Sequence, residues 1–434
     1  MRIERRCWDG ADPARLAGDL RAPESEATAS IATAVAVTID EVKTGGDRAV
    51  IDLGERFDGV RVDALRVRED ALTAAPAAID PRLRDALVRS AANIRNVAEA
   101  QLTASGVPEL VDGQRITVAE LPVGAAAVYA PGGRSPYPSS VLMGVIPAVV
   151  AGVGRIAVAS PPGPDGLPHV AVLAAARIAG VSEAYAMGGA QAIAALAHGT
   201  ESVERVDVIA GPGSPWVQEA KLQCSRIVGI DGYAGPSELM AVCDATADPT
   251  WIALDLVAQA EHGDDAPLVV ASPDGTVLDA VAAAVKRLAG DRPSAMDARL
   301  IVVETPNLDR ALALSEAFAP EHLLLACDDA AELAERVTTA GCVFVGAHSA
   351  VAFGDYAAGS NHILPTGGAG RFTGPVGPGT FRRRISRVAL DAGSAAALAS
   401  TVDVLATAEG FPVHGESAVA RAEGDASGPA EQAS

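Results

Sequence analysis

The stretch AAAVYAPGGRSPYPSSVLMGVIPAVVAGVGRIAVA, residues 125–159, decides the fold of this chain. It begins and ends with short apolar runs, 125–129 and 155–159, which are typical of buried strands. Glycine and proline in the turn 129–133 mark the end of the first run. From about residue 120 onward, such runs alternate with Ala- and Leu-rich helical stretches. This alternation predicts a parallel sheet that is covered by helices on both faces.

The same alternation continues through the chain and gives more strands than one small sheet can hold. The further predicted strands are 206–209, 239–242, 268–271, 300–303, 323–326 and 343–345. Helices are predicted over 27–44 and 81–105, where apolar residues recur at spacings of three and four. We therefore predict an α/β fold with two Rossmann-like parallel-sheet domains, a helical N-terminal arm and a C-terminal tail.

A break near Tyr129 and a Gly-rich turn at 234–237 indicate that one domain is inserted between two parts of another. The predicted parts are an N-terminal arm (1–26), a discontinuous α/β domain (27–128 and 238–370), an inserted α/β domain (129–237) and a tail (371–434). We expect the last dozen residues, which are small and polar, to be disordered. A ligand site is expected in the cleft between the two domains.

Length, charge and cysteine content exclude several classes of protein. The 434 residues suffice for two or three domains, and 49% hydrophobic with 21% charged residues is typical of a folded chain. The net charge of −21 repels phosphate backbones and anionic lipids, so we expect neither nucleic acid nor membrane as a partner. The five cysteines are widely spaced without a CxxC pair, and the N-terminus shows no secretory segment, so we expect a cytoplasmic protein.

Three side chains are candidate metal ligands. Gln259 and His262 stand three residues apart near the end of the predicted helix 251–262, so both project from one face and can share one ion. Asp355 lies in a Gly-rich polar loop, where a carboxylate suits a hard or borderline metal. The alternatives are a helix end capped by histidine for the pair, and a solvated Asx turn for Asp355.

Glu321 and His322 form an adjacent acid and base after Pro320, between the predicted helix 308–318 and the strand 323–326. Burial at a sheet edge would bring the pKa values of both groups toward the range of general bases. The alternative is that Pro-Glu simply starts a helical turn.

Three glycine-rich turns, 129–133, 187–191 and 211–214, follow strands of the inserted domain. Each can place backbone N–H groups at a helix N-terminus, where a dinucleotide phosphate binds well. None of them is a G-x-G-x-x-G fingerprint, and glycine turns between strands and helices are routine in α/β proteins.

Together these segments resemble histidinol dehydrogenases, and the resemblance runs from about Asp52 to Ala420. It is carried by QAEHG at 259–263, APEHL at 319–323, GDYA at 354–357 and NHILPT at 361–366. Supporting motifs are FDGV at 57–60, YAPGG at 129–133, EAK at 219–221 and AGPSE at 234–238.

The resemblance implies oxidation of L-histidinol to L-histidine in two hydride transfers through a bound aldehyde. It implies two NAD in turn and one Zn2+ per subunit as cofactors. By the same resemblance, the zinc ligands are Gln259, His262, Asp355 and His414. The tail that carries His414 would cross to the partner subunit of a homodimer.

The resemblance further implies roles for individual residues. Glu321 and His322 would be the bases, and Ser237, Glu409, His322 and the four zinc ligands would bind the substrate. The discontinuous domain 27–128 and 238–370 would be the metal-binding and catalytic domain. Tyr129, Gln191 and Ser214 would line the NAD site of the inserted NAD-binding domain 129–237. Ser214 departs from the family, which usually has Asn after this Gly-Pro-Gly. A shorter hydroxyl can still cap a helix or bond a ribose.

Two alternatives stand beside this interpretation. A paralogue with the same bases and metal could oxidise another polar alcohol, but the carboxylate of Glu409 suits a cationic or hydrogen-bonding substrate. A non-enzymatic protein could use zinc only to staple a dimer. The pair of Glu321 and His322 disfavours that alternative, because a structural zinc needs no adjacent bases.

Overall fold

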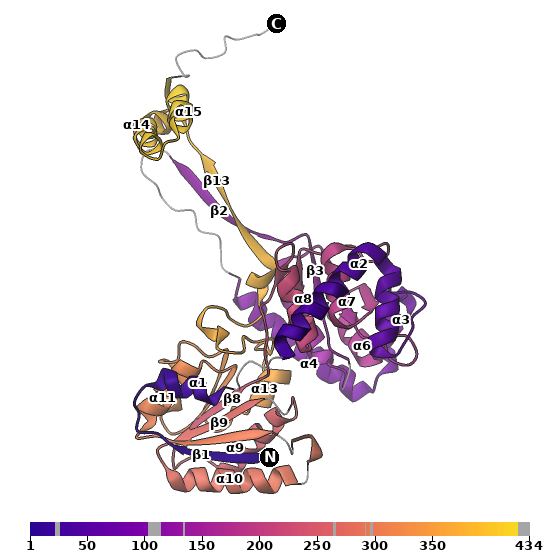
Figure 1. Ribbon diagram of the computed structural model, residues 1–434, viewed down its shortest axis with the longest axis vertical. Coiled ribbons are helices and arrows are strands. Elements are labelled where there is room, and N and C mark those ends of the chain that lie inside the picture. Colours follow the sequence, from indigo (N-terminus) through magenta and orange to yellow (C-terminus); the bar gives the residue numbers. More distant parts are fainter. Residues whose placement is uncertain are drawn as a thin grey trace. The chain divides into compact units, whose positions relative to one another are not determined.

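The computed structural model describes residues 1–21, 27–102, 114–132, 135–263, 266–290, 292–295 and 298–423. They fall into two compact units: Met1–Leu102 with Val123–Phe381, and Thr103–Pro122 with Arg382–Ser434. The first unit contains two parallel sheets, and the second contains an antiparallel strand pair and two helices (Figure 1). Gly133 of the predicted turn 129–133 lies outside the described residues. Residues 424–434, which are almost all of the segment predicted to be disordered, also lie outside them.

A five-stranded sheet of the first unit has the order β5-β4-β3-β6-β7, and all its neighbouring strands are parallel. Its strands are β3 (Ala125–Tyr129), β4 (Arg155–Ser160), β5 (Glu183–Ala186), β6 (Val208–Ala210) and β7 (Gly229–Ile230). The chain moves outward from β3 to β5 and then returns to the other side of β3. The strand order therefore reverses between β3 and β6, and in such sheets ligands bind at the carboxyl ends of these two strands.

Helices in two layers cover this sheet. The connecting helices are α5 (Pro138–Ala151), α6 (Val170–Ile178), α7 (Gly189–His198) and α8 (Pro215–Cys224). Outside them, α2 (Ala27–Asp58) packs on α7 and α8, α3 (Glu69–Ala78) packs on α6, and α4 (Pro81–Ala100) packs on α5.

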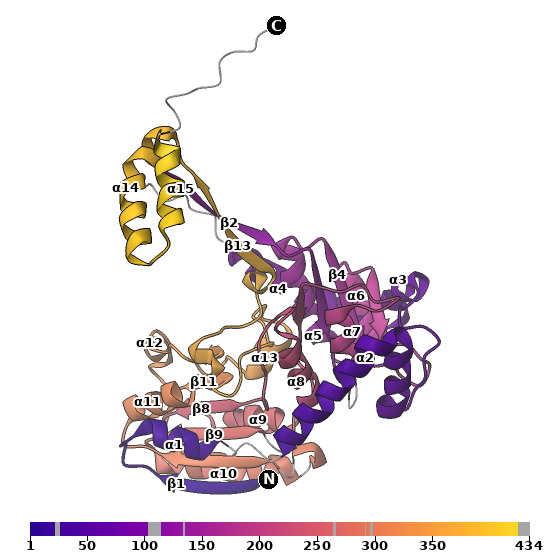
Figure 2. The ribbon, with the colours of Figure 1, turned by 45° about the horizontal axis from the view of Figure 1, so that its top comes forward.

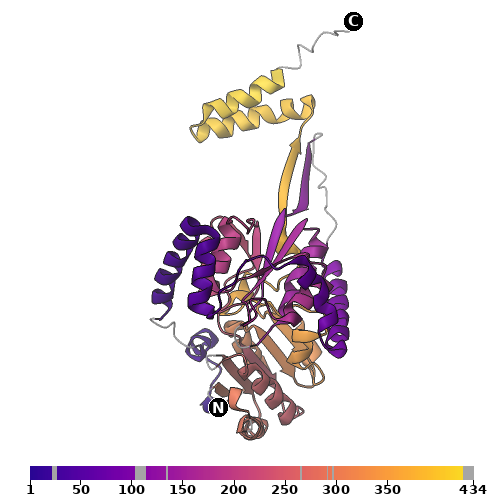
Figure 3. The same cartoon turned by 90° about the vertical axis from the view of Figure 1, so that its right-hand side faces the viewer.

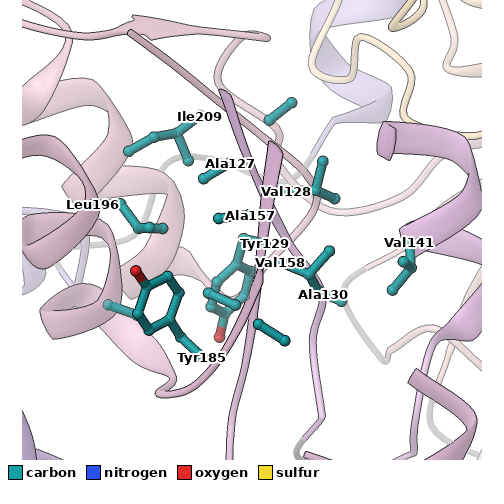
Figure 4. Packing of buried hydrophobic residues seen from close by; sticks show 14 of the residues in the cluster. Ala127, Val128, Tyr129, Ala130, Val141, Ala157, Val158, Tyr185, Leu196 and Ile209 are labelled. Carbon is teal, nitrogen blue, oxygen red and sulfur yellow. The ribbon is translucent and has the colours of Figure 1, made fainter. Parts of the chain in front are cut away.

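Small side chains allow the helices to approach the sheet closely. Ala127 and Ala157 are wholly buried in the core that Figure 4 shows, together with the larger Leu196 and Ile209. A Cβ at Gly144 of α5 would lie 2.5 Å from a methyl group of Val128 in β3. The Ala- and Gly-rich composition therefore reflects tight packing between helices and strands.

The six-stranded sheet has the order β1-β10-β9-β8-β11-β12 and is also parallel throughout. Its strands are β1 (Arg2–Cys7), β8 (Leu239–Cys243), β9 (Pro267–Ser272), β10 (Arg299–Glu304), β11 (His322–Ala326) and β12 (Cys342–Val345). The helices α9 (Pro249–Ala260) and α10 (Gly275–Gly290) pack on one face. On the other face pack α1 (Pro13–Leu20), α11 (Leu308–Phe318) and the short α12 (Ala330–Ala334), as Figure 2 shows. The two parallel sheets confirm the predicted α/β fold.

The N-terminal arm contains the helix α1, but it also contains the strand β1, which the sequence analysis did not predict. The sequence of β1, RIERRC, is mostly charged, and its exposure alternates along the edge of the sheet. Arg299 of the neighbouring β10 binds Glu4 of β1 through two hydrogen bonds of 3.1 and 2.8 Å. Charged residues are common on edge strands, and here they conceal the apolar alternation on which strand prediction depends.

The second unit is built around β2 (Arg115–Pro122) and β13 (Arg382–Ala389), which pair in antiparallel fashion. They are followed by α14 (Ala392–Ala408) and α15 (Pro412–Glu423), which lie side by side (Figure 3). This unit begins at Arg382, later than the tail predicted from residue 371. The reason is that Val376 and Phe381 are buried in the core of the first unit.

Short helices complete the described elements: α13 (Val351–Tyr356) and the 3-10 turns Pro293–Ala295, Ala369–Arg371 and Pro378–Phe381. Among the described residues, none of the helices combines the length and the apolar character that a membrane span requires.

Candidate functional site

The predicted acid–base pair lies at the amino end of β11. The helix α11 ends at Ala319, whose backbone is left-handed with φ of +48°, and the chain passes through Pro320 into the strand. His322 is the first residue of β11, and its backbone N–H donates to the carbonyl of Glu238, which immediately precedes β8. In this sheet the candidate site is therefore at the amino edge, between β8 and β11.

Glu321 is held by hydrogen bonds on one side-chain oxygen. Its side chain is buried, and Oε2 accepts the Ser237 hydroxyl at 2.5 Å and the Glu238 backbone N–H at 2.8 Å. The Ser237 hydroxyl also accepts a hydrogen bond from Nε2 of Gln259. Gln259, Ser237 and Glu321 therefore form a hydrogen-bonded chain that fixes the orientation of the carboxylate.

The imidazole of His322 lies between two carboxylates. Nδ1 is 3.0 Å from the carbonyl oxygen of Glu238, and because that oxygen only accepts hydrogen bonds, Nδ1 carries a proton. Nε2 is 3.4 Å from Oδ1 of Asp355 and has no hydrogen-bond partner among the described residues. Burial lowers the pKa of His322, but the charges of Glu321 and Asp355 outweigh it and raise this pKa to about 10.

The candidate metal ligands reach this cluster because two helices run back along the six-stranded sheet. The helices α9 and α13 follow β8 and β12, so their C-terminal residues Gln259 and Asp355 arrive at the amino edge of the sheet, beside His322. The negative end of the helix dipole of α9 favours a cation there. We call Ser237, Gln259, Glu321, His322 and Asp355 the acid–base cluster.

The chemistry of the donors fits a zinc ion. The side-chain amide of Gln259 is oriented by the hydrogen bond that its Nε2 donates to Ser237. Burial raises the pKa of Asp355, but the neighbouring His322 and the charges of His362 and His262 lower it overall. His262 follows the end of α9 and is exposed. An amide oxygen, an imidazole and a carboxylate are acceptable zinc ligands.

This donor set is incomplete within the first unit. Among the described residues, no group of three His, Cys, Asp or Glu side chains is placed to hold a metal. Zinc in proteins is almost always four-coordinate, with a substrate or water as the last ligand in catalytic sites.

Several supporting residues were not assigned by the sequence analysis. Arg21, at the end of α1, binds the buried carboxylate of Glu238 at 3.3 Å and lies over the ring of Phe318 at 4.2 Å. His362 binds the backbone carbonyl of Asp355 at 2.8 Å through Nδ1 and the hydroxyl of Ser140 at 3.0 Å through Nε2. Glu238 lies in the motif 234–238 and His362 lies in the motif 361–366. Nothing in the sequence connects Arg21 with Glu238, or Ser140 with His362.

The three predicted cofactor residues surround the switch point of the five-stranded sheet. Tyr129 ends β3, and its hydroxyl accepts the backbone N–H of Gly189 at 3.1 Å. Gln191, in the first turn of α7, is 1% exposed, and its Nε2 has no partner among the described residues. Ser214 precedes α8 and is exposed, but its side chain makes no capping hydrogen bond, contrary to the capping role considered above. The Gly188 cap leaves the N-terminus of α7 without a side-chain cap.

Glu409 and His414 belong to the second unit. Glu409 ends α14, and His414 lies in the first turn of α15 with its ring 5.6 Å from that of Phe411. Both residues are exposed.

Comparisons with known proteins agree on one family. A sequence profile described as histidinol dehydrogenase matches residues 21–422. The histidinol dehydrogenase of Thermobifida fusca is 41% identical over 418 residues, which cover 93% of this chain and 95% of that protein. That of Natronomonas pharaonis is 45% identical over 386 residues, covering 87% and 90%. The crystal structure of histidinol dehydrogenase from Elizabethkingia anophelis matches with a TM-score of 0.90 at 30% identity, over 98% of this chain and 99% of that chain.

Proposed function

Because the chain belongs to the histidinol dehydrogenase family of oxidoreductases, we propose that it oxidises L-histidinol to L-histidine through L-histidinal, with two NAD in turn. The observation that carries this proposal is the acid–base cluster. It joins two buried proton-transfer groups to candidate metal ligands at one sheet edge. A metal-assisted oxidation of an alcohol needs both kinds of group.

Gln259, His262 and Asp355 would hold one zinc ion per subunit, with His414 as the fourth protein ligand. When bound there, zinc would orient the amine and imidazole nitrogens of histidinol, and its charge would offset that of Asp355. The Gln259 amide, which Ser237 orients, and the charge of His262 acting on Asp355 support this assignment.

His322 would accept the hydroxyl proton of the substrate at Nε2, the ring nitrogen that lacks a hydrogen-bond partner among the described residues. Its Nδ1 stays against the carbonyl of Glu238 and keeps the ring in one orientation. Glu321 would take a proton from the water that hydrates the aldehyde, and Ser237 would hold that carboxylate in place. Bound NAD would accept the hydride in each oxidation.

NAD would bind at the carboxyl ends of β3 and β6, beside Tyr129, Gln191 and Ser214. Two observations support this position. The strand order reverses there, and the backbone N–H groups at the start of α7 carry no side-chain cap. Open N–H groups at a helix N-terminus favour a pyrophosphate.

We further propose a homodimer in which Glu409 and His414 complete the site of the partner subunit. Both are exposed, and so are the apolar side chains of Leu405, Phe411 and Val413 on the same two helices. Such an apolar surface suits docking onto a second copy of this chain. A cytoplasmic location is proposed because all five cysteines are free thiols.

The test is to load the purified protein with zinc, add L-histidinol and NAD, and count the NADH formed per histidinol consumed. Two NADH per substrate would support the proposal. One NADH would indicate a dehydrogenase that stops at the aldehyde. No NADH from histidinol, but turnover of another polar alcohol, would indicate a paralogue. No turnover of any alcohol would favour a zinc-stapled dimer without activity.

A further inference from the structure

Lys221 of α8 is buried to an unusual degree for a lysine, with 1% of its surface exposed. Its ammonium group forms an ion pair with Asp231 and donates to the carbonyl of Gly211 at 3.0 Å. Asp231 in turn accepts the backbone N–H of Gly211 at 2.7 Å. One buried ion pair therefore holds both polar backbone groups of a single glycine.

Gly211 begins the segment 211–214, which we call the cofactor loop. The φ of Gly211 is +127°, and a Cβ at this position would lie 2.1 Å from the carbonyl oxygen of Tyr129. Only glycine fits there, because the loop lies directly against the end of β3. The ion pair thus fixes the loop at the switch point where NAD is proposed to bind.

Gln218 connects this ion pair with the acid–base cluster. Its Oε1 accepts Nζ of Lys221 at 3.4 Å and the backbone N–H of Ala234 at 3.0 Å. Ala234 begins the turn 234–238, in which the Ser237 hydroxyl and the Glu238 N–H both donate to Glu321. A short path of hydrogen bonds and backbone therefore leads from the cofactor loop to the proposed base.

Stability alone does not explain a buried ion pair at this place. Burial removes both charges from water, and apolar residues of similar volume often stabilise a protein equally well. Lys221 and Gln218 are 1% exposed and the side chain of Asp231 is 4% exposed, and the ion pair is directed at the backbone of Gly211. Their effect on a reaction must act through the segments that they hold.

We propose that Lys221, Asp231 and Gln218 form a positioning brace that keeps the cofactor loop and the turn 234–238 at a fixed spacing. The nicotinamide ring and Glu321 must act on the same substrate carbon, so this spacing would set the rate of hydride transfer. The inference rests on the proposed function and goes beyond it, because it assigns roles to three residues that contact neither substrate nor cofactor.

The test variant, which we call the brace variant, is Lys221→Met/Asp231→Leu. It removes the ion pair without leaving one buried charge unpaired. The matched control is Arg155→Met/Glu183→Met, which removes an ion pair of 2.9 Å at the amino ends of β4 and β5 in the same sheet. NADH binding is measured by energy transfer from tryptophan, with Trp216 close by in α8, and needs no zinc. The melting temperature, kcat and the KM for each substrate are measured in parallel.

We expect the brace variant to bind NADH about tenfold more weakly and to lose about tenfold or more in kcat, while the KM for histidinol stays unchanged. The control should match the wild type in all three. Gln218→Leu keeps the ion pair and its hydrogen bonds to Gly211, and removes the hydrogen bonds of Gln218 with Lys221 and Ala234, so NADH affinity should stay and kcat should fall.

The inference is overturned if the brace variant and Gln218→Leu fold and both keep wild-type NADH affinity and wild-type kcat. It is also overturned if the melting temperature is the only quantity that changes. If the brace variant does not fold, Gln218→Leu decides the question. A wild-type protein that binds no NADH would instead overturn the proposed function.

Discussion

Replacing Glu321 with glutamine should separate the two oxidations. In the structure, Oε2 of Glu321 accepts hydrogen bonds from the hydroxyl of Ser237 and the backbone N–H of Glu238. An amide oxygen can accept the same two hydrogen bonds. The Glu321→Gln variant therefore keeps its side chain in place and loses only the negative charge and the ability to take a proton.

The size of the effect follows from this separation. General-base catalysis contributes about 10²- to 10⁴-fold, which corresponds to roughly 3–5 kcal/mol of activation free energy. Hydration of the aldehyde, the step assigned to Glu321, should slow by that factor. The first hydride transfer, whose proton goes to His322, should change by less than about tenfold.

The assay is a single-turnover measurement of NADH absorbance with enzyme in excess over histidinol. The wild type should form two NADH per histidinol, and the variant should form one rapidly and the second slowly. Supplying L-histidinal directly should give only the slow phase. The control is Glu321→Ala, which also loses both hydrogen bonds and should impair both steps. If Glu321→Gln slows both oxidations equally, the division of tasks is wrong.

Three further predictions concern the tail, the core and the thiols. Mixing inactive His414→Ala and His322→Ala proteins under subunit exchange should restore roughly a quarter of wild-type activity, because one site of each heterodimer bears neither change. If subunits exchange and activity does not return, the tail completes the site of its own subunit. Leu142→Ala, at a wholly buried site in α5, should lower the free energy of unfolding in urea by about 2–5 kcal/mol, and a change well below this range would contradict the tight packing. Burial raises the pKa of Cys243 to about 12, so at pH 8 this thiol should stay protonated and should not react with DTNB until the protein unfolds. Cys7 is exposed and should react in the folded protein, and equal reaction rates of the two thiols would be inconsistent with a buried β8.

The strands of the two parallel sheets could be predicted well where they are buried on both faces. Such strands are continuous apolar runs, as in β3 and β8, and all the predicted strands are present. The strands β1, β2 and β13 were missed because they are partly exposed, and β1 and β13 are also rich in charged residues. The strands β5 and β7 were missed because they have only four and two residues.

The candidate site was predictable only in part from spacing. The i and i+3 pattern placed Gln259 and His262 together, and adjacency did the same for Glu321 and His322. The approach of Asp355 to His322 depends on where α13 ends relative to β11, which local sequence does not determine. Neither Arg21 nor the pair of Lys221 and Asp231 could be found in this way, because their contacts join distant segments of the chain.

The pairing of β2 with β13 sets an order of events during protein synthesis. Arg115 pairs with Ala389, so β2 leaves the ribosome long before its only described partner strand exists. At about 5–20 residues per second, Ala389 follows Arg115 by roughly 14–55 s. During this interval the backbone of β2 is open to wrong partners, and charged side chains such as Arg115 and Glu120 disfavour aggregation. The second unit can therefore be completed only after residues 123–381 of the first unit have been synthesised.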